Sequence, residues 1–183
     1  MKYLKFLLIS FIYVFILVLY LNNSANKTLT GVIFDSFGIN CLTAIYFLFL
    51  LSACKTTLPD KFHKIRDFEK SGKLYKLMGV RIFKIILAKN PIPTFTGNLK
   101  LRSFSAEGLY KLEKLMRGAE TIHFQAFITM FIVMIPFGFF RDSHFFYFMI
   151  FFNVIINLYP VLVQRYNRSR IYKIQNINNK FSN

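Results

Sequence analysis

One glutamate and one histidine stand three positions apart, in the stretch Glu120-Thr121-Ile122-His123. On a helix, residues i and i+3 share a face, so the carboxylate and the imidazole can meet. A carboxylate that holds an imidazole orients the ring and stabilises its charged form, as a general base requires. The same spacing is also typical of a polar pair that anchors a helix at a membrane surface. Glu120 and His123 are therefore the candidate catalytic residues, with anchoring as the alternative.

A metal site is another chemistry that Glu-x-x-His can serve. A di-iron bundle takes two such pairs and two further glutamates, whereas this sequence has one pair. Cys41 and Cys54 lack metal-ligand spacing. On one helix they would lie about 20 Å apart, which is too far for a disulfide. The phosphate loop, Gly-x-Ser-x-Gly, His-Glu-x-x-His and Cys-x-x-Cys motifs are absent, so we expect no bound metal and no resident cofactor.

Amide side chains recur along the last apolar run. Asn153, Asn157 and Gln164 fall within about 40° of one another on a helical wheel. Pro160 leaves the carbonyl of Ile156 without its usual helical donor, which predicts a kink that could open a polar pocket. Amides in a span usually face other helices or a cavity. The pattern therefore predicts either hydrogen bonds between helices or a site for hydroxyl groups.

Three arginines follow this run, in Gln164-Arg165-Tyr166-Asn167-Arg168-Ser169-Arg170. Arginines at the end of a span commonly fix its orientation. Guanidinium groups also bind phosphate and pyrophosphate in a bidentate way. The stretch therefore predicts either a topology anchor or a clamp for an anionic substrate.

Four apolar runs must position these residues, at 4–21, 36–53, 121–140 and 145–163. Each is close to the roughly 20 residues that a helix needs to cross a bilayer. A helix is expected because backbone groups in lipid must pair within their own segment. Hydrophobic residues make up 55% of the 183 residues, which is too apolar for an ordinary soluble domain. The predicted fold is an all-α integral membrane protein, one membrane domain with about four transmembrane helices and cytosolic amphipathic helices.

The net charge of +16 is unevenly distributed along the chain. Four spans place the N-terminus, residues 55–120 and the C-terminal tail on one side, which holds 22 of the 24 basic residues. By the positive-inside rule this side is the cytosol. The surplus therefore indicates orientation and anionic lipid headgroups as a partner, instead of nucleic acid.

The segment 55–120 contains two predicted amphipathic helices. Residues 74–87 are apolar, yet four cations fall within about a 140° arc: Lys73, Lys76, Arg81 and Lys84. This pattern is typical of one interfacial helix, which Pro91 and Pro93 would end. Residues 105–118 predict a second helix that leads into the third span. Residues 58–62 and 68–75 predict a turn and a short link.

Four pieces of the sequence, taken in order, resemble a known family. They are Leu58-Pro59-Asp60-Lys61-Phe62, Phe68-Glu69-Lys70-Ser71-Gly72-Lys73, Ala119-Glu120-Thr121-Ile122-His123 and the arginine stretch 164–170. They look like the glycosyl-4,4'-diaponeurosporenoate acyltransferases, bacterial membrane enzymes that esterify a sugar hydroxyl of a glycosylated carotenoid with a fatty acyl chain. The similarity spans residues 36–172, and residues 1–35 look like an additional N-terminal piece.

The resemblance implies acyl transfer at the cytosolic face of a bacterial cytoplasmic membrane, with both termini cytosolic. His123 would take the proton of the acceptor hydroxyl, and Glu120 would hold the imidazole. The implied substrates are a lipid-anchored sugar and an acyl thioester, carried by coenzyme A or an acyl carrier protein. The residues expected to bind them are Arg165, Arg168, Asn157, Gln164, Asn167 and Arg170.

Two other classes remain open from the residues alone. A non-catalytic membrane adaptor or assembly factor would use the basic segment to hold a partner or anionic lipid. A small transporter fits less well, because no span has an acidic residue at its middle and paired half-helix breaks are absent.

Overall fold

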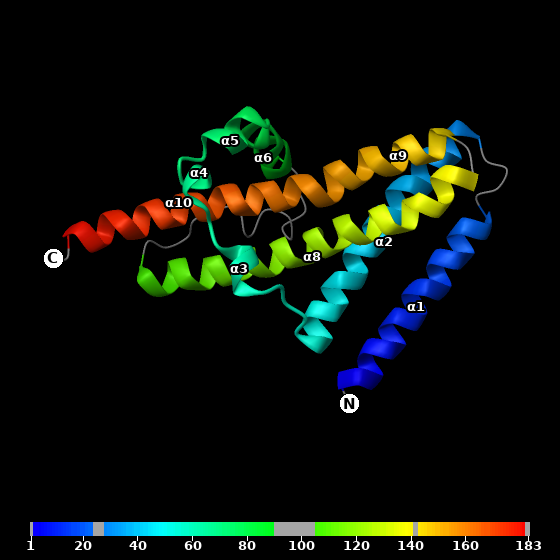
Figure 1. Ribbon diagram of the computed structural model, residues 1–183, viewed down its shortest axis with the longest axis horizontal. Helices are drawn as coiled ribbons and strands as arrows, with labels where there is room; N and C mark the ends of the chain where they lie inside the picture. Colours follow the sequence, from blue (N-terminus) through cyan, green and yellow to red (C-terminus); the bar gives the residue numbers. More distant parts are fainter. Residues whose placement is uncertain (1, 24–27, 90–104, 141–142, 182–183) are drawn as a thin grey trace. The chain divides into compact units, whose positions relative to one another are not determined.

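The computed structural model describes residues 2–23, 28–89, 105–140 and 143–181, and the elements in these ranges are all helices (Figure 1). Four of the described helical stretches are long and apolar enough to cross a membrane: Lys2–Leu19, Leu29–Cys54, Ala106–Ile135 and His144–Ile174. The predicted fold class, an all-α chain with four apolar helices of spanning length, is confirmed. Cys41 and Cys54 are free, as their spacing predicts.

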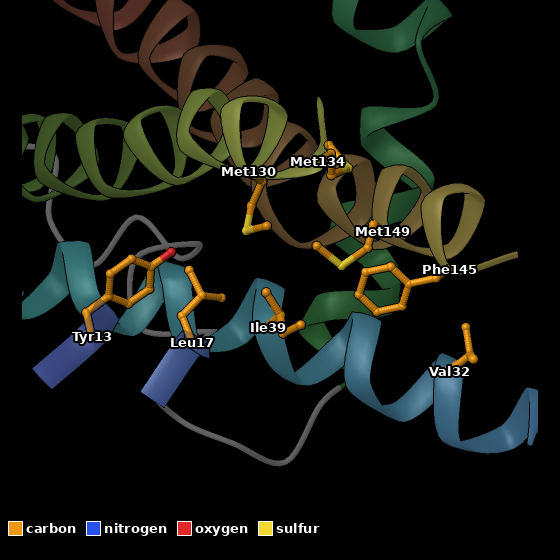
Figure 2. Packing of buried hydrophobic residues seen from close by; sticks show 8 residues of the cluster. All are labelled: Tyr13, Leu17, Val32, Ile39, Met130, Met134, Phe145 and Met149. Atoms are coloured by element: carbon orange, nitrogen blue, oxygen red, sulfur yellow. The ribbon is translucent and has the colours of Figure 1, made fainter. Parts of the chain in front are cut away.

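The chain divides into two compact units, and the first comprises residues 1–57 and 121–158. It contains α1 (Lys2–Asn23), α2 (Leu29–Cys54), the C-terminal part of α8 (Ala106–Phe140), α9 (Ser143–Asn153) and the π-helix η1 (Val154–Leu158). Helix α2 packs against both α1 and α9. The core between these helices is drawn in Figure 2 and consists of Tyr13, Leu17, Val32, Ile39, Met130, Met134, Phe145 and Met149.

The second unit comprises residues 58–120 and 159–183. Four short helices, α3 (Asp60–His63), α4 (Asp67–Lys70), α5 (Lys73–Leu77) and α6 (Val80–Ala88), precede the N-terminal part of α8. The last helix, α10 (Tyr159–Phe181), packs against α4, α5 and α6. Tyr75, Val80 and Val163 form one apolar cluster of this unit, and Leu109, Met116 and Ile171 form another.

The single interfacial helix expected over residues 74–87 is two helices, α5 and α6, so this prediction is wrong in detail. Gly79 separates them with φ of +73°, a left-handed conformation that glycine adopts without steric cost. The apolar pattern continues through Gly79, which is why hydropathy alone does not reveal the break. Pro91 and Pro93, which were expected to end the helix, lie outside the described residues.

A π-helical turn, η1, precedes Pro160. Proline has no backbone N–H to donate to the carbonyl four residues earlier, so the regular α-helical ladder cannot continue there. A π-turn is a common local adjustment of this kind and is frequent at functional sites. The departure from α-helical geometry therefore falls where Pro160 predicts it.

Candidate active site: a buried network of carboxylates and arginines

Glu120 is the centre of a buried polar network in the second unit. Its side chain is fully buried, and its carboxylate accepts hydrogen bonds from the guanidinium groups of Arg165 and Arg168. His63 Nδ1 lies 3.3 Å from the Oε2 atom of the same carboxylate. One carboxylate therefore joins an imidazole to two cations of α10.

Arg165 connects Glu120 to a second carboxylate, that of Glu69. Its Nε and Nη2 atoms donate to the two oxygens of Glu69 at 2.7 and 2.9 Å. This bidentate arrangement is the strongest geometry for an arginine–carboxylate pair. Arg165 also donates to the backbone carbonyls of Phe62, at 3.1 Å, and of Lys64, at 3.3 Å. The guanidinium group is thus held by two carboxylates and by backbone carbonyls at the C-terminal end of α3.

Arg168 is completely buried, so its charge must be compensated within the protein. It donates to Glu120 and to the backbone carbonyl of His63, and Glu113 lies 3.7 Å from its Nη2 atom. The two arginines of α10 therefore bind consecutive carbonyls of residues 62–64. This pairing explains how the C-terminal end of the short helix α3 is fixed against α10.

Glu69 has a pKa well below its ordinary value. Burial alone raises the pKa, but hydrogen bonds from Arg165, Tyr75 and the backbone N–H of Arg66 outweigh it and lower the pKa to about 2. The backbone N–H of Arg66 is 2.7 Å from Oε2. Burial and the hydrogen bond to Glu69 together raise the pKa of Tyr75. Glu69 is therefore ionised and Tyr75 neutral across the physiological pH range.

Glycine at position 72 is needed to bring this segment against α10. Gly72 is the N-cap residue immediately before α5 and has φ of +69°. A Cβ atom there would lie 3.2 Å from the Cε2 atom of Tyr166, which is closer than ordinary van der Waals contact. The Phe-Glu-Lys-Ser-Gly-Lys piece thus supplies both the Glu69 carboxylate and the close approach to α10.

His123, the predicted base, lies in the first unit. Its ring is next to the side chain of Asn157 and the backbone of Ile156. The carbonyl of Ile156 lacks its usual helical donor, because Pro160 has no backbone N–H. The Nδ1 atom of His123 and the Oδ1 atom of Asn157 are buried and have no hydrogen-bond partner among the described residues. Buried polar atoms of this kind normally have a partner, which a water or a ligand can supply.

The amide stripe is used partly for hydrogen bonds between helices. Asn157 Nδ2 donates to Asn153 Oδ1 at 2.9 Å and to Asn40 Oδ1 at 3.2 Å. Asn153 Nδ2 donates to the carbonyl of Phe127 at 3.1 Å. Gln164 belongs to the second unit, where its Oε1 atom is buried and unpartnered within the described part of the chain.

The structure thus brings three predicted residues, Glu120, Arg165 and Arg168, into one network. The contacts of Glu120 go to these arginines and to His63, so the expected Glu120–His123 pair stays a prediction. Asn167 lies between the two arginines in the sequence of α10 and binds Lys84, and Arg170 lies two residues beyond Arg168. Sequence spacing missed His63, Glu69 and Tyr75, although Glu69 belongs to one of the pieces that carry the family resemblance.

These features define a class: a helical chain with four apolar helices of spanning length and a buried network of carboxylates, arginines and histidine. The sequence model of the glycosyl-4,4'-diaponeurosporenoate acyltransferase family matches residues 59–176. The chain belongs to this family, as the four pieces predict. The match begins at Pro59 instead of near residue 36, and it includes every member of the network. No curated protein and no solved structure matches the chain.

Proposed function

We propose that the protein is a membrane acyltransferase that esterifies a hydroxyl of a glycosylated carotenoid or similar glycolipid with a fatty acyl chain. The family match over residues 59–176 carries this proposal. The acceptor is a lipid-anchored sugar, and the donor is an acyl thioester. The membrane is the bacterial cytoplasmic membrane, with both termini and the matched segment 59–120 on the cytosolic side.

The reaction needs one proton acceptor and one group that stabilises charge. As the acceptor hydroxyl loses its proton to an imidazole nitrogen, its oxygen attacks the carbonyl carbon of the thioester. The tetrahedral intermediate collapses, the carbon–sulfur bond breaks, and the thiolate takes the proton back from the imidazolium. The products are the ester and a free thiol, and the imidazole is regenerated.

His123 is our first candidate for the base, because its buried Nδ1 atom has no partner among the described residues. Asn157, beside it, has an unpartnered Oδ1 atom that can accept a hydrogen bond from a substrate hydroxyl. His63 is the second candidate, because Glu120 lies 3.3 Å from its Nδ1 atom and can orient the ring. The two candidates make different predictions for the same assay.

For Arg165 and Arg168 we propose a positioning role. Both guanidinium groups are engaged by Glu69 or Glu120 and by backbone carbonyls, which compete with binding of a donor phosphate. Their ion pairs hold residues 62–64 and Glu120 in one arrangement. Loss of either arginine should therefore disturb the whole network.

Purified His123→Ala and His63→Ala proteins, assayed for acyl transfer from an acyl thioester, test the assignment. Loss of the general base should lower kcat by about 10²-fold to 10⁴-fold. His144→Ala is the matched control and should keep full turnover. Full turnover by both folded variants would show that neither imidazole is the base.

The substrate class needs a separate measurement. Mass spectrometry of lipids from a strain lacking the gene should show loss of an acylated glycolipid and accumulation of its unacylated precursor. Genes for a carotenoid synthase and a glycosyltransferase beside this one would favour a carotenoid acceptor. An unchanged lipid profile would contradict the proposal.

A further inference from the structure

Lys84 on α6 is held by an amide of α10 instead of by a carboxylate. Its Nζ atom donates to Asn167 Oδ1 at 2.7 Å. An ammonium group can only donate, so the oxygen of the amide must face Lys84 and the orientation of Asn167 is determined. The Nδ2 atom of Asn167 is consequently a donor turned away from Lys84. That atom is buried and has no partner within the described residues.

Arg170 adds a second positive charge to this place. It lies one turn beyond Asn167 on α10, with an exposed side chain. Burial and the nearby charge of Arg170 lower the pKa of Lys84. In the described ranges neither Lys84 nor Arg170 has a carboxylate within ion-pair distance. The neutral amide of Asn167 therefore does not balance the positive charges of Lys84 and Arg170.

The carboxylates of the second unit are already paired with cations other than Lys84 and Arg170. Each of the six forms an ion pair with another cation: Asp60, Asp67, Glu69, Glu107, Glu113 and Glu120. Residues 90–104 and 175–183 add no acidic residue to this unit, because their sequences contain neither Asp nor Glu. No side-chain carboxylate of this unit is therefore left unpaired to neutralise Lys84 and Arg170.

We propose that Lys84, Asn167 and Arg170 form a binding site for a phosphate group. Phosphate oxygens are strong acceptors, and the three side chains offer two cationic donors and one amide donor. The same helix α6 exposes Ile82, Ile85 and Ile86, so the bearer of the phosphate is a molecule with an apolar part. This moves the predicted anion clamp from Arg165 and Arg168, whose charges are already paired with carboxylates, to Lys84, Asn167 and Arg170.

Two kinds of molecule combine such a phosphate with an apolar part: an acyl thioester of coenzyme A, which is a soluble acyl donor, and a phospholipid. The first rests on the proposed function, whereas the second is independent of it. Both can be tested on the full-length protein in a maltoside detergent, which contains no phosphate. The probes are coenzyme A and a short-chain phosphatidylglycerol, and the measurement is the Kd from isothermal titration.

We expect one of the probes to bind, and Lys84→Gln and Arg170→Gln to weaken its binding by about 10-fold to 100-fold, because a charged hydrogen bond is lost. Lys114→Gln is the control, since Lys114 is an exposed cation of helix α8 in the same unit. Its Kd should match that of the unaltered protein. Without a probe, Lys84→Gln should unfold at the same temperature or higher, because a partly buried charge has been removed.

Selective weakening for coenzyme A identifies a donor site, and selective weakening for phosphatidylglycerol identifies a lipid site. Failure of both probes to bind, or equal weakening by Lys114→Gln, would overturn the proposal. The binding assay does not depend on turnover. A protein that binds but transfers no acyl group would refute the proposed function alone, and an active enzyme with unchanged binding in Lys84→Gln would refute the site alone.

Discussion

Glu120 illustrates how strongly a single residue can depend on its partners. A buried carboxylate is stable only when its charge is paired and its oxygens accept hydrogen bonds. Glu120 meets this requirement through Arg165, Arg168 and His63. The converse also holds, since Arg168 is fully buried and relies on the same carboxylate.

Glu120→Gln should therefore lower the free energy of unfolding by about 3–5 kcal/mol, because it leaves a buried guanidinium short of negative charge. Thermal or denaturant unfolding in detergent measures this loss. The control is Glu107→Gln, which removes an exposed pair with Lys111 on the same helix and should change little. Equal effects of the two substitutions would show that the network does not stabilise the fold.

Glu69 predicts a pH dependence of stability. Its pKa is lowered in the folded protein from 4.5 to about 2, so the native state disfavours protonation. The stabilisation is therefore complete above pH 4.5 and is lost as the pH falls towards 2. The stability gap between the unaltered protein and Glu69→Gln should shrink over this range in unfolding curves recorded at successive pH values. A constant gap would contradict the assignment.

The short helices α4, α5 and α6 depend on two glycines at their junctions. Gly72 and Gly79 both have positive φ, which costs an L-residue about 1–2 kcal/mol. Alanine at 72 would also bring a Cβ atom within 3.2 Å of Tyr166, whereas at 79 the nearest atom is 3.9 Å away. Gly72→Ala should therefore lower the unfolding temperature more than Gly79→Ala. An equal or reversed order would show that the approach of α5 to α10 is not tight.

Helices α5 and α6 together present an apolar surface bordered by cations. Its large exposed side chains are Leu74, Leu77, Met78, Ile82, Ile85 and Ile86, and its exposed cations are Lys73, Lys76 and Arg81. Apolar side chains beside basic ones are typical of a segment that lies in the interface of an anionic bilayer. We therefore keep the prediction that this segment rests on lipid, although it is broken at Gly79.

The chain contains no tryptophan, so one introduced tryptophan reports its own position. In nanodiscs that contain brominated lipid, Ile86→Trp fluorescence should be quenched by the lipid and protected from aqueous acrylamide. Tyr110→Trp, at an exposed position of α8, is the control and should show the opposite pattern. Acrylamide quenching of Ile86→Trp equal to that of the control would refute the interfacial placement.

For the molecule as a whole, hydropathy predicted the helices better than the site. The apolar runs are local features of the sequence, so most of the helices could be read from them. One predicted run was too short: it began at residue 36, after Asp35, whereas α2 begins at Leu29. The Thr28 hydroxyl caps this start by accepting a hydrogen bond from the Gly31 N–H. The network joins residues about 50 to 100 positions apart, such as Glu120 and Arg165, and no periodicity links them. Only the order of the four family pieces pointed to these residues together.

The surface charge of the whole molecule distinguishes the two candidate functions, membrane acyltransferase and non-catalytic adaptor. If the protein is an adaptor, its exposed cations hold the partner, and reversing Lys73, Lys76 and Arg81 to glutamate should abolish function. If it is an acyltransferase, this triple variant should only weaken attachment of α5 and α6 to anionic lipid. It should then lower the amount of acylated glycolipid several-fold and leave some product.

The matched comparison is the double variant His63→Ala/His123→Ala, expressed in a strain that lacks the gene. The enzyme should lose all acylated product in this double variant, because no candidate base remains. The adaptor should keep its function, since the cationic surface is intact. The measurement is lipid mass spectrometry of the two strains, with protein levels matched by immunoblotting. If the protein is an enzyme, the double histidine variant should be the more damaging, because catalysis depends on an imidazole. If it is an adaptor, the triple charge-reversal variant should be the more damaging, because binding depends on surface charge.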